Sequence, residues 1–474
     1  MRILLLAMPD TSYWLDYYIR MPNLALISLA GNLPEHDVKI LDLALIKPKI
    51  KDILKKTLED FKPQIVGMSA MSFQFATLLR VARFIRTWDS SIKLVAGGYH
   101  PSLMASEIVI NGSMLPLDFI VRCEGEITFR ELVNEIAKES TRFDLIKGLT
   151  YFQDEKWFHN PDRPISNLED ILPPKRDSRI RHDFYFLDMP GDVAETSRGC
   201  PLNCKFCSIT QMYGRSFRQF LIDRVISDLK SMRDRGTKAV FFVDDNITYD
   251  TEHFREICQA IIDNELTNLY YIIQTSAIGI AKHPDIVELM DRANFRLAAV
   301  GLESMDPSAL KEMRKGTNPE MNQRAVSLLK KHKIGVNVLF IVGYPDDTKE
   351  SIIRSYRKMR KLKPDGIYVQ YLTPYPKTEI RQEMLDANLV ENKDDFSKYD
   401  GFSCNVRTKH LTQKELFGIL QKECIKAYFD LRLIFSNYLL RRHFKAFVSC
   451  TFKTFGVNLY NIIKGKQKAQ QLDI

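Results

Sequence analysis

Apolar runs and amphipathic stretches alternate along the first 150 residues. The amphipathic stretches, such as Ile50–Phe61 and Phe73–Arg86, repeat apolar residues at three- and four-residue spacing, which predicts helices. The apolar runs predict five strands, at Arg2–Met8, Asp37–Asp42, Ile65–Met68, Lys93–Ala96 and Asp118–Arg122. Strands that are apolar throughout and separated by helices indicate a parallel sheet covered on both faces. We therefore expect a doubly wound, Rossmann- or flavodoxin-like α/β domain over residues 1–147.

A second alternating region begins near Val193 with a longer period. It predicts either a second open sheet or a partial (β/α)6 TIM-type barrel over residues 191–396. Its six strands are expected at Val193–Ser197, Ala239–Val243, Tyr271–Gln274, Leu297–Gly301, Asn337–Val342 and Ile367–Tyr371. The intervening stretch 148–190 is rich in proline and predicts a linker. Beyond residue 397 helical patterns predict an α-helical extension to residue 474.

Small and polar residues follow the predicted strands, where parallel sheets and barrels bind their ligands. In the first domain the small residues would let a ligand approach closely. These loops are Ser69-Ala70-Met71-Ser72, Gly97-Gly98-Tyr99-His100-Pro101 and Glu124-Gly125-Glu126. In the second region the strand ends deliver Cys200, Asp244-Asp245-Asn246, Gln274 and Glu303. We therefore expect a ligand site at the carboxyl edge of each sheet.

Three of the eight cysteines fall within eight positions, as Cys200-Pro-Leu-Asn-Cys204-Lys-Phe-Cys207. Thiolates are the usual ligands of iron–sulfur clusters, and three this close can bind three corners of a [4Fe–4S] cube. One iron would then remain open to a ligand. A three-cysteine zinc site with one distant ligand is the alternative, although zinc usually uses paired motifs. A redox disulfide would leave one of the two spacings unused. The spacing therefore favours cluster ligation by Cys200, Cys204 and Cys207.

The composition is that of a folded protein. Of 474 residues, 45% are hydrophobic and 27% charged, which excludes a disordered chain. No run of about 18 apolar residues occurs, and the short apolar start fits a first strand better than a signal peptide. We therefore expect a cytoplasmic protein. The formal net charge of +9 equals that of Val406–Ile474, where 13 basic and 4 acidic residues lie.

The segment from Ser197 to Cys207 resembles the CxxxCxxC signature of the radical S-adenosylmethionine (SAM) superfamily, and the likeness extends to about Glu379. The resemblance implies a partial TIM-type barrel, a [4Fe–4S] cluster whose open iron binds SAM, and an external electron donor of the flavodoxin or ferredoxin type. It also implies contacts with SAM for Phe206, Asp244, Asp245, Gln274 and Glu303. The cationic groups of SAM need carboxylates nearby. A cap or turn is the alternative role for either aspartate and for Gln274.

The first domain resembles the cobalamin-binding domain joined to many radical SAM enzymes. Its five-strand pattern, the Gly97–His100 loop and Val121–Phe129 carry this likeness. The cobalamin-contacting residues would then be Ser69, Gly97, Gly98, Glu124 and Gly125. The Asp-x-His-x-x-Gly motif is absent, which implies cobalt without a protein histidine ligand. A hydrogen-bonded loop role is favoured for His100. A flavin, a partner surface or a domain that binds nothing are the alternatives.

Together the two resemblances imply methyl transfer to an unactivated carbon. A SAM-derived radical would remove hydrogen, and cobalamin would supply the methyl group. By pattern the nearest relatives are lipid and hopanoid methylases and anaerobic protoporphyrin-ester cyclases, so a small hydrophobic or lipid-like substrate is expected. Cyclisation, hydroxylation or C–C coupling is the alternative reaction. A cobalamin- or redox-sensing binding protein is the alternative from another class.

The basic carboxyl-terminal region interleaves aromatic and basic residues over Ile434–Ile463. A helical cap packed over the barrel mouth, with its lysines in solvent, is the favoured interpretation. Peripheral contact with the inner face of a membrane is the second. Nucleic acid is not expected, because the additional domain of the branch that modifies transfer RNA is not recognisable here.

Overall fold

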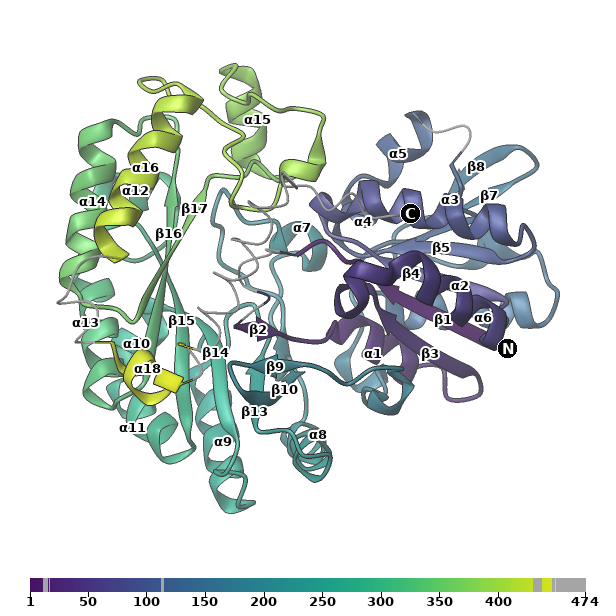
Figure 1. The fold of residues 1–474 in the computed structure, drawn as a ribbon, viewed down its shortest axis with the longest axis horizontal. Helices are drawn as coiled ribbons and strands as arrows, with labels where there is room; N and C mark the ends of the chain where they lie inside the picture. The colour runs from purple at the N-terminus through teal and green to yellow at the C-terminus, as the bar shows by residue number, and fades with distance from the viewer. Residues whose placement is uncertain (12–15, 17, 112–114, 429–436, 446–447, 449–474) are drawn as a thin grey trace. The chain divides into compact units, whose positions relative to one another are not determined.

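The chain divides into two compact units in the computed structural model, which describes residues 1–11, 16, 18–111, 115–428, 437–445 and 448 (Figure 1). The first unit is built on Met1–Tyr17 and Pro22–Phe184. The second is built on Tyr18–Met21 and Tyr185–Phe452. Each unit contains one large sheet with helices packed against it.

A seven-stranded sheet of order β3-β1-β4-β5-β6-β7-β8 forms the first unit. Its parallel strands are β1 (Arg2–Ala7), β3 (Asp37–Asp42), β4 (Ile65–Ser69), β5 (Lys93–Gly97) and β6 (Phe119–Val121). Two antiparallel strands, β7 (Leu149–Gln153) and β8 (Lys156–His159), extend its far edge. The strand order reverses between β1 and β4, as in flavodoxin-like sheets. The predicted α/β fold class is confirmed for this unit.

Helices cover both faces of this sheet because its strands are apolar on both sides. Leu4 and Leu6 of β1 belong to the core packed beneath α2 and α3, whereas Ile3 and Leu5 face α1 and α6. The helices are α1 (Leu24–Gly31), α2 (Ile50–Phe61), α3 (Phe75–Trp88), α4 (Tyr99–Leu103), α5 (Ala105–Asn111) and α6 (Gly125–Ala137). Short 3₁₀ turns lie at Leu43–Lys49, Ser72–Gln74, Phe143–Leu145, Leu168–Asp170 and Arg176–Ser178.

The second unit contains an open, curled sheet of order β17-β16-β15-β14-β13-β10-β9-β2. Six neighbouring strands are parallel, which confirms the partial (β/α)6 barrel. They are β10 (Met189–Ala194), β13 (Ala239–Phe242), β14 (Tyr270–Ser276), β15 (Phe295–Glu303), β16 (Gly335–Val342) and β17 (Gly366–Tyr371). The short strands β9 (Tyr185–Phe186) and β2 (Ile19–Arg20) add antiparallel pairs at one edge. A separate hairpin pairs β11 (Ser197–Arg198) with β12 (Arg218–Gln219).

Helices line the outside of this curled sheet (Figure 1). Those that alternate with the strands are α8 (Ile222–Asp234), α9 (Thr251–Asp263), α10 (Ala277–Lys282), α11 (Pro284–Arg292), α12 (Pro307–Glu312), α13 (Pro319–Lys331) and α14 (Lys349–Lys361). The other described helices of this unit are α7 (Ile209–Tyr213), α15 (Glu379–Asp386), α16 (Gln413–Tyr428) and α18 (Tyr438–Arg442). A 3₁₀ turn lies at Phe396–Lys398. The carboxyl ends of the six parallel strands meet at one edge, where the cysteine loop begins.

The stretch 148–190 differs from the linker predicted for it. Its first part forms β7 and β8 of the first sheet, and its last part forms β9 and the start of β10. The buried guanidinium of Arg122, on the loop after β6, explains why the first part of the stretch pairs with the sheet. It donates to the Thr150 hydroxyl, the Asn160 carbonyl and the Asp162 carboxylate (2.8 Å), and these bonds hold the stretch against the sheet.

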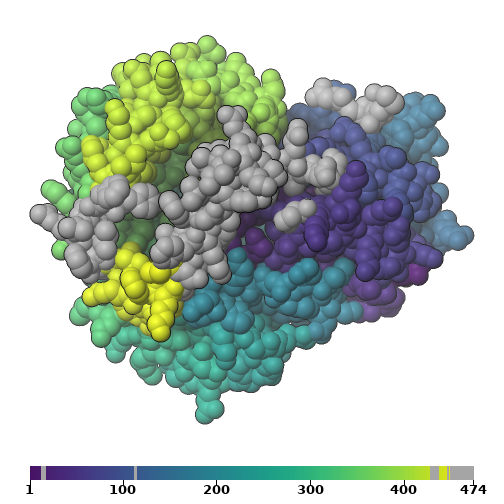
Figure 2. All heavy atoms as spheres, in the orientation of Figure 1, coloured from purple at the N-terminus to yellow at the C-terminus, as the bar shows by residue number. Residues whose placement is uncertain are grey.

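The described part of the carboxyl-terminal region packs on the second unit. On α16, Leu416 is fully buried. Asn437 and Tyr438 hydrogen-bond to Asp365 just before β17, and Leu439 joins the core at the amino ends of the strands. The short helix α18 therefore lies at the amino edge of the sheet and not at the barrel mouth, and Figure 2 shows it as the bright yellow patch. Helix α16, by contrast, packs near the carboxyl ends of β16 and β17, where Leu416 lies beside Gly343 and Phe417 stacks on Tyr371.

Most of the aromatic and basic pattern over Ile434–Ile463 lies outside the described residues. The membrane interpretation therefore stays a prediction. Among the described residues, no helix combines the length and apolar character that a membrane crossing requires.

Candidate functional site

A glycine sets the path of the cysteine loop as it leaves β10. Gly199 has φ +87°, and a Cβ at this position would lie 2.5 Å from the backbone oxygen of Ser216. Only glycine adopts this backbone conformation at little cost and leaves room for that carbonyl. The chain can therefore turn directly from β11 into Cys200.

The middle of the cysteine loop is fastened by backbone hydrogen bonds at Lys205. The N–H of Lys205 donates to the Met313 carbonyl, and its own carbonyl accepts from the Ile380 N–H, both at 3.2 Å. The Cys207 N–H closes a tight turn onto the Cys204 carbonyl at 3.1 Å. The loop after α12 and the start of α15 thus hold the two cysteines in place.

The three thiols lie close enough to influence one another's ionisation. All are half-buried and free of disulfide. Burial raises the pKa of each thiol, for Cys207 to about 12, whereas the nearby Lys315 ammonium lowers it. The Cys200 charge also raises the pKa of Cys204, and the charges of Cys200 and Cys204 raise that of Cys207. Among the described residues, no three His, Cys, Asp or Glu side chains converge on the position of a single metal ion. Three neighbouring thiols beside a cation fit an iron–sulfur cluster, whose ligands are thiolates.

Asp244 anchors the start of the cysteine loop from the end of β13. Its carboxylate accepts from the Thr196 N–H (3.0 Å), the Thr196 hydroxyl (2.7 Å) and the Ser197 hydroxyl (2.6 Å). Burial raises the pKa of Asp244 to about 6, although these hydrogen bonds lower it. A buried carboxylate that accepts several hydrogen bonds from one loop holds that loop. The geometry favours the structural role that the sequence left open for Asp244.

Asp245 and Asn246 act on the next residues of the same loop. An Asp245 carboxylate oxygen accepts from the Gly199 N–H at 3.0 Å, and burial raises its pKa to about 6. The Asn246 side chain hydrogen-bonds to Cys200 and accepts from the Ser276 N–H at 3.1 Å. Asp245 is thus hydrogen-bonded to the residue before Cys200, and its charge raises the pKa of that thiol.

Glu303 and Lys315 form a buried ion pair beside the cysteines. The Lys315 Nζ lies 2.8 Å from Glu303 Oε1 and 5.8 Å from the centre of the Phe206 ring. Phe206 precedes Cys207, so its ring, the ion pair and the thiols occupy one region at the ends of β10 and β15. Of the predicted SAM contacts, Phe206, Asp245 and Glu303 are thus brought to the cysteine loop.

Two further side chains lie at the strand ends of this sheet. Gln274 is half-buried near the end of β14, where its carbonyl accepts from the Ile247 N–H at 3.4 Å. Tyr344 follows β16 and is 1% exposed, and its hydroxyl has no hydrogen-bond partner among the described residues. The charges of Glu303 and Cys204 act on that hydroxyl. A buried donor without a partner beside the thiols fits a bound ligand that offers an acceptor.

At the carboxyl edge of the first sheet, two predicted loops pack directly on each other. The Ala70 N–H donates to the Gly97 carbonyl at 3.0 Å. Gly98 has φ +92°, and a Cβ there would lie 2.8 Å from the Ala70 carbonyl and 2.9 Å from Ser69 Oγ. Glycine at this position thus lets the loops after β4 and β5 meet.

Glu124 and Gly125 begin α6 at the same edge of the sheet. A Glu124 carboxylate oxygen accepts from the Ser166 N–H at 3.2 Å, and a Cβ on Gly125 would lie 3.2 Å from Leu29 of α1. His100 is 2% exposed, and its Nδ1 lies 3.3 Å from the Ser72 hydroxyl. These contacts agree with the hydrogen-bonded loop role favoured for His100.

Asp10 lies after β1, at the point where the strand order reverses. Its Oδ1 accepts from the Thr77 hydroxyl at 3.0 Å, while its buried Oδ2 has no partner among the described residues. Burial raises the pKa of Asp10. Ligands of open α/β sheets bind at this reversal. A buried acceptor there fits a ligand that carries N–H or O–H donors, as the amide side chains of cobalamin do.

Sequence reasoning missed Lys315 and Asp10 as site residues, and it reached Tyr344 only as part of Val338–Pro345, a segment that resembles the superfamily's fifth-strand motif near the adenine of SAM. Lys315 follows a short helix, and nothing in its sequence neighbourhood distinguishes it from solvated lysines. Tyr344 stands in the Gly343-Tyr344-Pro345 strand end, which was a usable signal. Asp10 follows the first strand directly, so the rule that ligands bind after strands could have found it.

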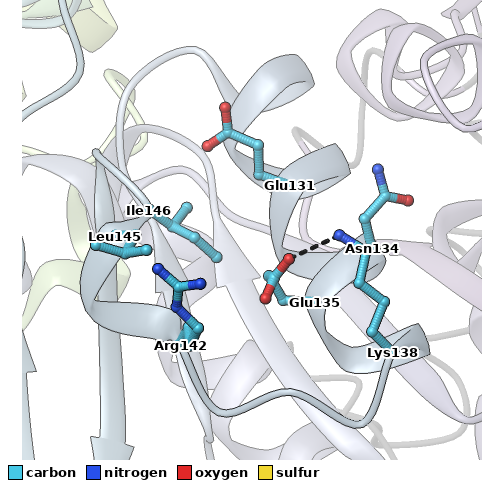
Figure 3. A pocket seen from close by; sticks show the side chains of 7 residues that line it. All are labelled: Glu131, Asn134, Glu135, Lys138, Arg142, Leu145 and Ile146. Carbon is cyan, nitrogen blue, oxygen red and sulfur yellow. Dashed lines mark hydrogen bonds and ion pairs between the residues drawn. The ribbon is translucent and has the colours of Figure 1, made fainter.

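A hollow lies on the first unit beside α6, and Figure 3 shows its lining residues. It is formed by the last turns of α6 and the segment that follows, and Lys138 there donates to Glu135 at 3.0 Å. Its lining residues are Glu131, Asn134, Glu135, Lys138, Arg142, Leu145 and Ile146. Because α6 starts at the carboxyl edge of the sheet, its last turns lie at the opposite edge. The hollow therefore contains none of the predicted ligand contacts.

Two protein families match this chain, one in each of the two sheet-containing units. Residues 194–359 match the family described as Radical SAM superfamily, and residues 16–133 match the B12 binding domain. The first match contains the cysteine loop and the strands from β13 to β16. The second contains most of the parallel strands of the first sheet.

Relatives cover most of the chain. An uncharacterized methyltransferase of Pyrococcus horikoshii is 30% identical over 425 residues, 88% of this chain and 90% of the relative. The hopanoid C-3 methylase of Methylococcus capsulatus is 26% identical over 381 residues, 78% of this chain and 70% of the relative. An anaerobic magnesium-protoporphyrin IX monomethyl ester cyclase of Rubrivivax gelatinosus is 27% identical over 373 residues, 77% of this chain and 65% of the relative.

A solved structure shares the fold. The radical SAM methyltransferase TsrM of Kitasatospora setae, with cobalamin and a [4Fe–4S] cluster bound, superposes with a TM-score of 0.67. The match covers 81% of this chain and 75% of that one, at 18% identity.

Proposed function

The chain belongs to the radical SAM superfamily and carries a B12-binding domain at its amino end, and from this premise we propose that it methylates an unactivated carbon of a small hydrophobic or lipid-like molecule. It is a radical SAM enzyme, and the cofactors of its class are a [4Fe–4S] cluster, SAM and cobalamin. The observation that carries the proposal is that the Pyrococcus horikoshii relative, matched over nine-tenths of its length, is named as an uncharacterized methyltransferase.

In the second unit, Cys200, Cys204 and Cys207 would hold the cluster. When bound, the cluster supplies the electron that cleaves SAM, and cobalamin supplies the methyl group. An external flavodoxin or ferredoxin would deliver that electron. The acidic turn after β13 keeps the cysteine loop in shape, since its three side chains bind the loop at successive residues.

The SAM site would be built by side chains around the cysteines. Phe206 offers a ring face for the adenine, and Asp245 and Glu303 offer negative charge to the cationic groups of SAM. Tyr344 offers a buried hydroxyl without a partner among the described residues. Gln274 would contact SAM from the end of β14.

In the first unit, the carboxyl edge of the sheet would hold cobalamin. Ser69, Gly97 and Gly98 form the packed loops after β4 and β5, and Glu124 and Gly125 begin α6. At the same edge, the orphaned Asp10 carboxylate oxygen supports a donor-bearing ligand. No histidine ligand to cobalt is proposed, because His100 is buried against Ser72.

A labelled methyl group tests the reaction. The cluster-loaded protein would be incubated with cobalamin, a low-potential reductant, methyl-labelled SAM and a lipid extract from cells that lack the gene. We expect label in a hydrophobic product only when cobalamin is present. Cleavage of SAM without label in any product would contradict methyl transfer and favour the second candidate, a cyclase, which the likeness to the protoporphyrin ester cyclases supports.

An enzyme that acts on a lipid-like substrate would gain access to it by binding the membrane surface, and the basic carboxyl-terminal residues would make this contact. Residues 446–474 carry four basic residues and one acidic residue, and truncation after Lys445 leaves the packed α16 and α18 intact. Sedimentation with anionic phosphatidylglycerol vesicles would compare the two chains. Weaker binding by the truncated chain supports the contact, and equal binding contradicts it.

A further inference from the structure

The buried pair of Lys315 and Glu303 stands beside the proposed cluster ligands. The two side chains are 12% and 6% exposed, and their nearest charged atoms are 2.8 Å apart. A buried ion pair adds little to stability compared with apolar residues of similar volume. Stability alone therefore does not account for two charges at this position.

The backbone of β15 is shaped to accept this pair. A Cβ on Gly301 would lie 2.6 Å from Glu303 Oε1 and 2.8 Å from Lys315 Nζ, so the missing side chain makes room for both charges. Glu303 itself has φ +59°, at a shift in register between β15 and β16. A left-handed conformation is strained at a residue other than glycine and persists only where its surroundings hold it. Strain and a register shift together re-aim Glu303 toward the lysine.

The loop that carries Lys315 runs along the cysteine loop. The Met313 carbonyl accepts from the Lys205 N–H at 3.2 Å, and the Cys204 sulfur lies 3.8 Å from the Arg314 carbonyl. The lysine ammonium also lies 5.8 Å from the Phe206 ring centre, one residue before Cys207. The ammonium is thus fixed next to the thiols by its ion pair and by the backbone on either side.

The ionisation of Lys315 agrees with this placement. Burial lowers its pKa, but the charges of Glu303 and of the Cys204 and Cys207 thiolates raise it above the usual 10.5. The ammonium therefore stays charged throughout the physiological range.

We propose that Lys315 is a positioning residue that raises the reduction potential of the cluster held by the three cysteines, and that Glu303 sets the size of this effect as its counter-charge. The proposal rests on cluster binding by those cysteines. Accepting one electron adds a negative charge to the cluster, and a fixed cation nearby stabilises the reduced form. Charge and hydrogen bonding around a cluster are known controls of its potential.

The test is a redox titration of the cluster in the full chain, without SAM. The amplitude of the electron paramagnetic resonance signal of the reduced cluster would be followed as the solution potential is lowered with dithionite. Wild type, Lys315→Met, Glu303→Gln and the double variant would be compared. Iron and acid-labile sulfide, measured in each, show that the cluster is present.

Opposite shifts are expected from the two single changes. At a fixed potential, Lys315→Met should lower the ratio of reduced to oxidised cluster about tenfold, which corresponds to about 59 mV for one electron. Glu303→Gln should raise that ratio, and the double variant should lie between the two. If Lys315→Met fails to load a cluster, the direction of the Glu303→Gln shift alone decides the matter.

A matched control is Lys330→Met. The Lys330 ammonium lies 3.8 Å from the carboxylate of the buried Asp365, at the amino edge of the same sheet. The substitution therefore removes a similarly paired lysine far from the cysteines. Its potential should equal that of wild type. Unchanged potentials in cluster-loaded Lys315→Met and Glu303→Gln would overturn the proposal and leave cluster binding intact. Absence of iron and sulfide from wild type would instead refute cluster binding itself.

Discussion

Asp244 accepts hydrogen bonds from both the backbone N–H and the hydroxyl of Thr196, at 3.0 and 2.7 Å. These two hydrogen bonds connect the end of β13 to Thr196, which lies just before the cysteine loop. It makes the carboxylate an anchor for the loop, and the hydroxyl of Ser197 completes the arrangement at 2.6 Å.

Asp244→Asn should destabilise the second unit and loosen the cysteine loop. The amide nitrogen would face donors that need an acceptor, and a buried mismatch of this kind costs about 2 kcal/mol. Thermal unfolding should show a lower midpoint, and iron content after reconstitution should fall. Asp234→Asn on the exposed end of α8 is the control and should change neither quantity. Unaltered stability and iron content in Asp244→Asn would contradict the anchoring role.

Asp347 should make the stability of the second unit depend on pH. Its carboxylate accepts from the Gly343 N–H (2.8 Å) and the Tyr344 N–H (3.0 Å), and burial raises its pKa from 3.8 to about 6. A raised carboxyl pKa means that the folded state holds the proton more tightly than the unfolded state. Its contribution is therefore fully present below about pH 4 and is lost as pH rises through about 6.

Asp347→Asn should remove this pH dependence. Between about pH 4 and pH 8, wild type should lose about 2–3 kcal/mol of unfolding free energy relative to the variant. Urea unfolding across that range measures the difference. A constant difference between the two proteins would show that the pKa of Asp347 is not raised.

Gly98→Ala should disrupt the carboxyl edge of the first sheet. The new methyl group would lie 2.8 Å from the Ala70 carbonyl, on a backbone with φ +92°. Strain and collision together should cost about 2 kcal/mol or more, and cobalamin binding should weaken. Gly236→Ala is a matched control, since Gly236 has φ +87° but no atom within 4 Å of its Cβ position. Equal losses of stability in the two variants would argue against loop packing as the reason for Gly98.

Tyr344→Phe should weaken SAM binding without loss of the cluster. A ligand acceptor that loses this buried donor should bind about tenfold less tightly. Calorimetric titration of SAM into the cluster-loaded protein measures the affinity. Tyr356→Phe, which removes a hydroxyl from a buried tyrosine packed against Phe340, is the control. Wild-type affinity in Tyr344→Phe would remove this residue from the SAM site.

The strands and the cysteine site could be predicted from the sequence, because each depends on residues that are close together along the chain. Apolar runs place Asp37–Asp42 with the bounds seen in β3, and the triplet spacing alone brings Cys200, Cys204 and Cys207 together. The other predicted strands differ from the observed ones by one to four residues at one or both ends, and one of these differences has a clear physical reason. The strand predicted at Val193–Ser197 is β10, which ends at Ala194 because Thr196 and Ser197 turn toward Asp244.

The tertiary partners of single residues could not be predicted. The Lys315–Glu303 pair joins the loop after α12 to the end of β15, at a register shift that no sequence pattern predicts. The stretch 148–190 read as a linker because its prolines outweigh two short strands, which a buried Arg122 draws onto the sheet. In both cases the deciding contact depends on how the chain folds back, over 12 residues for Lys315 and Glu303 and over 28 or more for Arg122, and not on a local pattern.

The most direct test of the central claim is the metal content and SAM cleavage of the anaerobically reconstituted chain. We expect about four iron and four sulfide per chain and formation of 5′-deoxyadenosine under reduction. Cys200→Ala, Cys204→Ala and Cys207→Ala should each abolish this cleavage, whereas Cys404→Ala should retain it. One zinc without sulfide, or an unchanged yield of 5′-deoxyadenosine in the three cysteine variants, would contradict the claim.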